Sequence, residues 1–190
     1  NSYGFNACFY NCSSLTTAPS FDKVTTVNSY GYHGCFSYCT SLTTAPKFDK
    51  VTTVSDSSFH NAFANCSSLT TTPNFSNITS VGNLGFNACF QNCTKLQVIY
   101  IPNITTWITG DFVDWVDGVA TTGVVFKSAT LEIPTGTNGV PTGWITLNVS
   151  YDYSDIENGN LGITVAFTDG ENEPVKDAFA TKTFNFASAP

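Results

Sequence analysis

The sequence contains no methionine, and only 11% of its 190 residues are charged. Seven basic residues stand against fourteen acidic ones, so the formal net charge is −7. A chain this poor in lysine and arginine lacks the cationic surface that nucleic acids and anionic membranes attract. We therefore expect no nucleic-acid partner.

Long apolar runs are also missing. The longest falls far short of the roughly 20 residues that span a bilayer, and no signal-peptide pattern is present. We therefore expect no membrane insertion. Polarity comes instead from Thr, Ser and Asn, which indicates an extracellular, cell-surface or virion-surface protein. Because the chain begins at Asn1 and lacks methionine, we expect a processed or truncated product, with room for further repeats before it.

A repeat of 27 residues organises the chain. Four related segments start 27 residues apart, at residues 2–9, 29–36, 56–63 and 83–90. A fixed period of this length is typical of stacked supersecondary units. Phe5, Cys8, Phe9 and Cys12 fall at i, i+3, i+4 and i+7, the spacing of one helix face, and the later units repeat it. Ser, Asp or Asn at the start of each segment can cap a helix. The pattern predicts one short helix per unit.

Two short extended pieces follow each predicted helix. The first is β-prone and closed by proline, at residues 15–19, 42–46 and 69–73. The second leads to the next unit, at residues 24–27, 51–54 and 78–81. One helix plus short strands per unit predicts an α/β solenoid of leucine-rich-repeat-like coils, in which neighbouring coils complete each other's core.

The run at residues 8–19, CFYNCSSLTTAP, resembles the BspA-type leucine-rich repeats of bacterial surface proteins, which also occur in gut phage and some protozoan surface proteins. The resemblance covers residues 1 to about 147. This chain places Cys or Ala before the second phenylalanine, where many such repeats have Met. The resemblance implies an extracellular, non-enzymatic scaffold for adhesion or recognition, with no catalytic residues to carry over.

The chain changes after the fourth coil. Residues 96–102 are longer and more apolar, residues 111–119 predict a short helix ended by Gly118, and residues 124–127 predict a strand. Residues 133–144 form a series of turns ending on Trp144, and this block is similar to the terminal element of BspA-type arrays. We expect four coils at residues 1–109, a cap at residues 110–147 and a β-strand segment at residues 148–190.

The last segment has its own pattern. Residues 145–153 alternate apolar and polar side chains, residues 163–167 predict a second strand that turns at Asp169, and residues 183–186 predict a third. Three strands form a poor independent domain. The appended sheet is expected to pack on the solenoid or to pair with another molecule.

The seven cysteines follow the repeat. They occur as C-x3-C pairs at 8/12, 35/39 and 89/93, and Cys66 has Ala62 where its mate would stand. Alanine can replace a cysteine that merely packs, but not half a disulfide. The pattern favours buried free thiols, with disulfides and metal binding as alternatives.

No catalytic set can be assembled. His33 and His60 share one repeat position with Asn6 and Asn87, which favours a polar row over a metal or glycan contact. Neither histidine has a matched nucleophile with an orienting carboxylate. We expect a protein without enzymatic activity, cofactor or metal.

Two further kinds of site are considered. Asp152, Asp155 and Glu157 are weak calcium candidates in an oxygen-rich turn that lacks EF-hand spacing. Whether the possible glycosylation sites are used depends on the source. These sequons are Asn11, Asn65, Asn77, Asn92, Asn103 and Asn148.

The function expected is that of a structural surface or fibre subunit, which forms a homo-oligomer or filament through its C-terminal strands. The alternative is an adhesin or phage receptor-binding module. That module would bind a host protein or glycan on the strand face around Thr17, Thr44 and Thr71.

Overall fold

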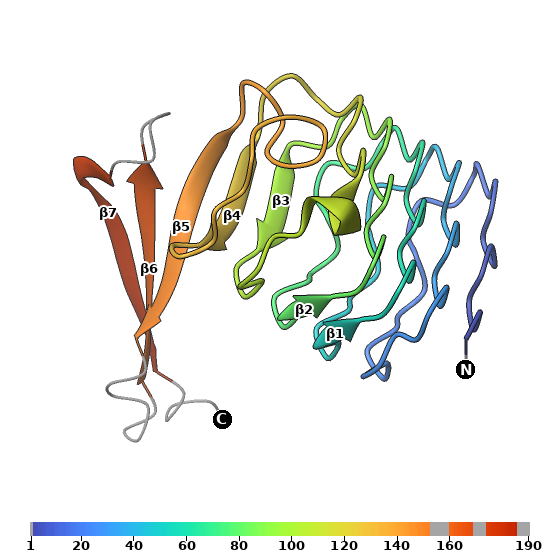
Figure 1. The fold of residues 1–190 in the computed structure, drawn as a ribbon, viewed down its shortest axis with the longest axis horizontal. Helices are drawn as coiled ribbons and strands as arrows, with labels where there is room; N and C mark the ends of the chain where they lie inside the picture. The colour runs from blue at the N-terminus through green and yellow to red at the C-terminus, as the bar shows by residue number, and fades with distance from the viewer. Residues whose placement is uncertain (1, 153–159, 169–173, 186–190) are drawn as a thin grey trace.

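The computed structural model describes residues 2–152, 160–168 and 174–185. Successive coils lie side by side from the N-terminus onward, and the longest strands lie at the opposite end (Figure 1). Each coil follows one 27-residue repeat, so equivalent residues of neighbouring coils are in contact. The chain is therefore a solenoid-like stack, as the repeat predicts.

The prediction of one short helix in each coil is wrong. Residues 2–11 and their equivalents form runs of turns. Their backbone N–H groups donate alternately to a carbonyl of the same coil and to a carbonyl of the next coil. The N–H of Asn6 donates to the Tyr3 carbonyl of its own coil (3.3 Å), whereas the N–H of Ala7 donates to the His33 carbonyl of the next coil (2.9 Å). The second kind of bond takes N–H groups that a helix would need for itself.

Positive φ angles mark every fourth residue of these runs. A right-handed helix cannot contain them, and asparagine and glycine adopt them most readily. The residues are Tyr3, Ala7, Asn11, Tyr30, Gly34, Tyr38, Ser57, Asn61, Asn65, Leu84, Ala88 and Asn92. The left-handed residues Asn11, Asn65 and Asn92 thus lie within turns rather than at helix ends.

A fifth turn run replaces the short helix predicted at residues 111–119. The 3-10 helix η1 (Thr109–Phe112) begins it, and turns continue to Gly118, whose φ is 71°. The Phe86 N–H donates to the carbonyl of Asp111, so this run stacks on the fourth coil like the earlier ones. In the described part of the chain η1 is the only helix.

The two extended pieces of each coil form parallel pairings between coils. β1 (Thr53–Val54) pairs with β2 (Ser80–Val81), and Val27 forms a bridge to Val54. These pieces are strands of two residues or single bridges rather than long strands. The predicted extended segments are confirmed in position.

A five-stranded sheet ends the stack. It orders β3 (Val98–Ile101), β4 (Val124–Ser128), β5 (Ile145–Asp152), β6 (Asn160–Thr168) and β7 (Pro174–Asn185). The first three strands are parallel and the last two add antiparallel. The strands predicted near residues 124, 145 and 163 are confirmed, and the third C-terminal strand starts earlier than predicted. The turn predicted at Asp169 lies outside the described residues.

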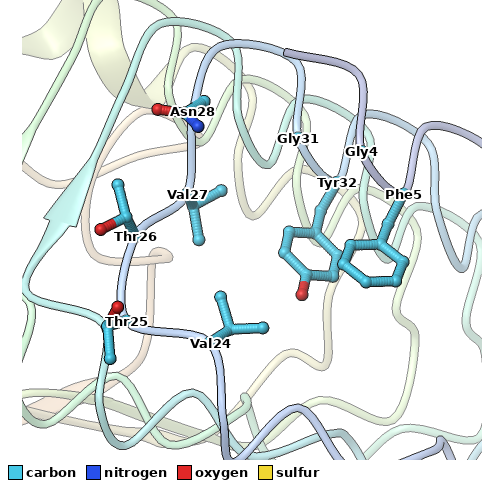
Figure 2. A pocket seen from close by; sticks show the side chains of 9 residues that line it. All are labelled: Gly4, Phe5, Val24, Thr25, Thr26, Val27, Asn28, Gly31 and Tyr32. Carbon is cyan, nitrogen blue, oxygen red and sulfur yellow. The ribbon is translucent and has the colours of Figure 1, made fainter. Parts of the chain in front are cut away.

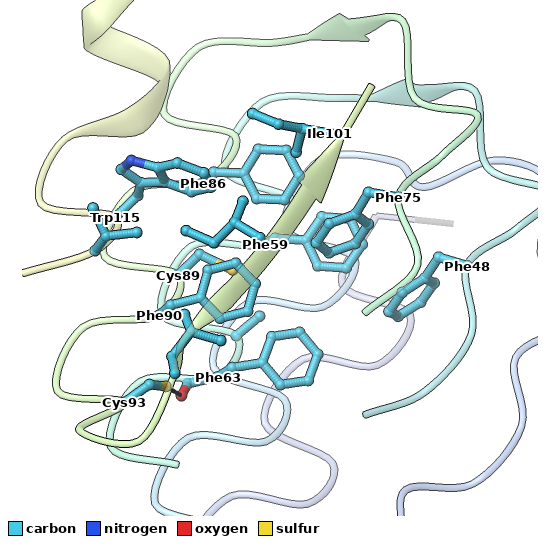
Figure 3. Packing of buried hydrophobic residues seen from close by; sticks show 14 of the residues in the cluster. Phe48, Phe59, Phe63, Phe75, Phe86, Cys89, Phe90, Cys93, Ile101 and Trp115 are labelled. Atoms are coloured by element: carbon cyan, nitrogen blue, oxygen red, sulfur yellow. Dashed lines mark hydrogen bonds between the residues drawn. The ribbon is translucent and has the colours of Figure 1, made fainter. Parts of the chain in front are cut away.

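Stacked phenylalanine rows form the core. Phe59 stacks on Tyr32 and Phe86 with ring centroids 5.4 Å apart on either side, and it meets Phe75 edge-on at 5.5 Å. A second row runs through Phe63, whose ring lies parallel to its neighbours at 5.3 and 5.5 Å. Figure 3 shows these rings layered along the stack. Each pair adds about 0.5–1.5 kcal/mol beyond its burial.

Five of the seven cysteines are buried free thiols, as predicted. The thiols of Cys39, Cys66 and Cys93 each donate to a phenylalanine carbonyl of the preceding coil at 3.1 Å. Burial raises the pKa of Cys35 to about 12 and that of Cys39 to about 11. These thiols therefore remain protonated and act as small apolar groups with a weak donor.

The exposed pair, Cys8 and Cys12, gives a simple test. We expect iodoacetamide at pH 8 to alkylate these two thiols in the folded protein and all seven after unfolding in guanidinium. Mass spectrometry counts the adducts. Five or more adducts without unfolding would contradict the buried thiol rows.

The fifth turn run is covered by the turns predicted to cap the solenoid. The Asp114 N–H donates to Asn138 Oδ1 at 2.7 Å, and the Trp115 indole N–H donates to the Gly139 carbonyl at 2.9 Å. Thr137 accepts the N–H of Val116 at 3.3 Å. The cap thus accepts hydrogen bonds from N–H groups of the fifth turn run, which would otherwise donate to a following coil.

Candidate functional site

A groove of about 480 Å³ runs across the turn runs of the first four coils. We call it the turn-face groove. Its floor includes Ala7, Gly34 and Asn61, three residues at positive φ positions. A Cβ atom on Gly34 would meet nothing within 4 Å, so the floor is open at that point. The small floor residues leave room for a ligand above the backbone.

Two tyrosines border this groove. Tyr10 and Tyr38 are 55% and 45% exposed, and their ring centroids lie 5.7 Å apart at an interplanar angle of 68°. They are large apolar surfaces left in contact with solvent, each with a hydroxyl that can donate or accept a hydrogen bond.

Amide side chains line the other part of the groove. Asn65 Oδ1 accepts a bond from Asn92 Nδ2 at 3.3 Å, and Gln91 Nε2 donates to Asp117 Oδ2 at 3.4 Å. The described lining contains no lysine, arginine, aspartate or glutamate. The groove therefore offers neutral donors and acceptors beside aromatic faces.

His33 lines the groove and contacts His60, with ring centroids 4.8 Å apart. Burial lowers the pKa of His60 below its ordinary value of 6.5, and the neighbouring His33 lowers it further. Within the polar row predicted at this repeat position, His33 and His60 are thus in direct contact. Among the described residues, no group of three or more His, Cys, Asp or Glu could hold a metal ion.

This contact predicts a pH dependence. The folded protein binds a proton at His60 less readily than the unfolded chain does. The contribution of neutral His60 to the stability of the fold is therefore complete above pH 6.5, and it is lost as the pH falls from 6.5 toward the pKa of His60 in the folded protein. We expect the melting temperature to fall from pH 7.5 to pH 5.5, and to fall less in His60→Asn. Asparagine already stands at Asn6 and Asn87 in this row. Equal losses in the two proteins would contradict the argument.

The residues predicted to form the strand face lie elsewhere. Thr17 and Thr44 form a parallel bridge, Thr71 pairs with Val98, and all three threonines are exposed. None of them lines the turn-face groove. Among the calcium candidates Asp152 ends β5, whereas Asp155 and Glu157 lie outside the described residues. The calcium prediction therefore stays a prediction.

The six sequons fall into different environments. Asn11 and Asn92 are exposed, but Asn92 and Asn65 bond to each other. The side-chain amides of Asn77 and Asn103 donate to carbonyls of the preceding coil. Asn148 Oδ1 is buried without a hydrogen-bond partner in the described residues. The asparagines therefore have structural contacts of their own, and glycosylation stays a prediction.

Sequence reasoning missed the groove. The available signal was Tyr38, which stands where Asn11, Asn65 and Asn92 occupy the other coils. An exposed aromatic residue that departs from a repeat indicates a local role, but its neighbours follow only from the turns.

The repeat, the parallel pairings and the stacked core define a leucine-rich-repeat solenoid. Residues 3–113 match the BspA type leucine-rich repeat region in six copies, and they make up more than half of the chain. The chain belongs to this family. Its members are usually surface-associated and typically non-catalytic. No curated protein and no solved structure matches the chain significantly.

One negative finding concerns membranes. Among the described residues, none of the helical structure is long and apolar enough to cross a bilayer.

Proposed function

We propose that this chain is a non-catalytic surface recognition protein that binds a neutral glycan in its turn-face groove. The observation that carries the proposal is the composition of that groove, which pairs exposed Tyr10 and Tyr38 with amide side chains and lacks charge. Its volume of about 480 Å³ lies within the range of small-ligand sites.

The chemistry of the lining suits a sugar. A sugar ring has an apolar C–H face and a rim of hydroxyl groups, which are both donors and acceptors. Tyrosine rings contact the apolar face, and Asn61, Asn65 and Gln91 supply both kinds of hydrogen-bonding group. A charged ligand would find no counter-ion in the lining.

A glycan array with matched variants tests the proposal. We expect Tyr38→Asn, which restores the residue of the other coils, to weaken binding at least tenfold. Tyr3→Ser is the control, because Tyr3 is 59% exposed and lies outside the groove lining. Binding that survives Tyr38→Asn but is lost in Thr44→Lys would overturn the groove and favour the strand face.

The edge strand β7 supports a second candidate function, that of a structural subunit. β7 is the last strand of the five-stranded sheet and pairs on one side with β6 in the described residues. An edge strand of twelve residues offers backbone groups to a neighbouring chain. Negative-stain electron microscopy over a range of concentrations tests it. Filaments or ordered oligomers support the candidate, and single particles at every concentration overturn it.

A further inference from the structure

The turn-face groove is longer than a single sugar. Its lining extends from Tyr10 in the first coil to Gln91 in the fourth. Equivalent rings of these four coils, in the row that begins at Phe9, follow one another at centroid distances of 5.1, 5.3 and 5.5 Å. Three steps between adjacent strands extend over roughly 15 Å. One hexose is much shorter, so the groove has room for several sugar units in a row.

The floor of the groove stays low along this length. Ala7, Gly34 and Asn61 share one repeat position and all line the groove at positive φ. Beside them, Ser37 and Ala64 are only 4% and 3% exposed, so their side chains do not rise above the floor. A ligand can therefore lie along the stack across the first three coils.

The two ends of the groove differ in chemistry. Tyr10 and Tyr38 border the part formed by the first two coils, and Asn65 and Gln91 border the part formed by the third and fourth. Tyrosine rings suit the C–H face of a sugar, and amide groups suit its hydroxyls. Because these two parts belong to different coils, different sugar units of one ligand meet them.

The spacing of the coils restricts the linkage. The coils lie side by side at a nearly constant distance (Figure 1). Sugars joined by β-1,4 bonds form extended chains that advance by close to one coil step per unit, whereas α-1,4 bonds give chains that curl. An extended chain can follow the floor from coil to coil.

We infer that the turn-face groove binds a linear, β-linked neutral oligosaccharide that lies along the stack with one sugar unit per coil. The inference rests on the proposed function and adds the class and the orientation of the ligand. The units over the first two coils contact Tyr10 and Tyr38, and the unit over the fourth coil bonds to Gln91.

A second hollow in the first coils is too short for such a ligand. It has a volume of about 260 Å³, and Phe5, Val24 and Tyr32 project into it (Figure 2). Its lining belongs to the first two coils only. The exposed Thr26 also lines this hollow and gives a control position for the binding experiments.

Calorimetric titration with oligosaccharides of increasing length tests the inference. The probes are β-1,4-linked glucose, mannose, xylose and N-acetylglucosamine series of one to four units, with maltotetraose as the α-linked control. Within a series that binds, we expect the tetrasaccharide to bind at least tenfold more tightly than the monosaccharide. Maltotetraose is expected to bind at least tenfold more weakly than that tetrasaccharide.

Gln91→Ala tests the orientation, because alanine already stands at the equivalent position of the third coil, Ala64. We expect this variant to bind the tetrasaccharide at least fivefold more weakly and the disaccharide with unchanged affinity. Thr26→Tyr, which fills the second hollow, is expected to leave binding at every length unchanged. Equal losses at both lengths in Gln91→Ala, or a loss in Thr26→Tyr, would overturn the arrangement.

The outcomes separate this inference from the proposed function. Equal affinity for one and four units, tighter binding of maltotetraose, or binding confined to branched neutral glycans would overturn the inference and leave the groove as a glycan site. Binding of no neutral glycan, on the array or in solution, would overturn both.

Discussion

Replacing Phe59 by alanine is expected to lower the free energy of unfolding by about 3–5 kcal/mol. Phe59 has no exposed surface, and its ring contacts four aromatic neighbours from its own and adjacent coils. Its removal leaves a cavity in the middle of the stack that neighbouring coils cannot close. For a chain of this length the melting temperature is expected to fall by roughly 10 °C. Thermal unfolding followed by tyrosine fluorescence and circular dichroism measures the change.

Phe5→Ala is the matched control, because Phe5 occupies the same repeat position in the first coil. Its ring is 37% exposed and meets Tyr32 and Phe21 on one side only. We expect a loss of less than half that of Phe59→Ala. Equal losses would mean that stability does not come from the stacked rows.

Replacing Gly139 by alanine is expected to detach the cap and cost about 3 kcal/mol or more, at the upper end of overpacking effects. A Cβ atom at this position would lie 1.8 Å from the Pro134 carbonyl oxygen, which accepts the N–H of Val140. The displaced backbone would also lose the bond from the Trp115 indole. Tryptophan fluorescence should shift to longer wavelength as Trp115 meets water, well before the coils unfold.

Gly110→Ala controls for the effect of adding a methyl group. A Cβ atom on Gly110 would meet nothing within 4 Å, and its φ is not positive. We expect a change within about 0.5 kcal/mol, as for surface substitutions in general. A Gly139→Ala protein as stable as Gly110→Ala would show that the cap adds little to the solenoid.

The repeat allowed most of the architecture to be predicted. The strict 27-residue period predicted stacked coils, and the positions of the short parallel pairings followed from the recurring Leu-Thr-Thr and Val-Thr-Thr pieces. Ala62 stands where the other coils have the first cysteine of each pair, which predicted that the cysteines are buried as free thiols. Five of the seven cysteines are buried free thiols. These features depend on residues that recur, so one unit reports on the next.

The helix prediction failed for an identifiable reason. Phenylalanine and cysteine at i, i+3, i+4 and i+7 fit a helix, but they fit a run of four-residue turns equally well. Tyr3, Ala7 and Asn11 at positive φ decide between the two, together with N–H groups taken by the neighbouring coil. A helix this short is only marginally stable by itself, so hydrogen bonds to the neighbouring coil can replace the bonds within the helix.

The candidate site was predictable only in part. The sequence suggested a binding face at Thr17, Thr44 and Thr71, which are exposed in the structure, and binding there stays a prediction. The turn-face groove depends on how Tyr10, Tyr38 and Gln91 from different coils meet across the turns. Tyr10 and Gln91 share one repeat position and Tyr38 stands at the next, so the 27-residue period places them in adjacent rows, but the groove itself follows only from the turns.

The most direct measurement is amide chemical-shift mapping by NMR during titration with the glycan that binds best on the array. We expect the largest changes on residues 33–38, 61–65 and 91, with saturation at one ligand per chain. Changes centred on Thr17, Thr44 and Thr71, or on β7, would contradict the turn-face groove as the recognition site.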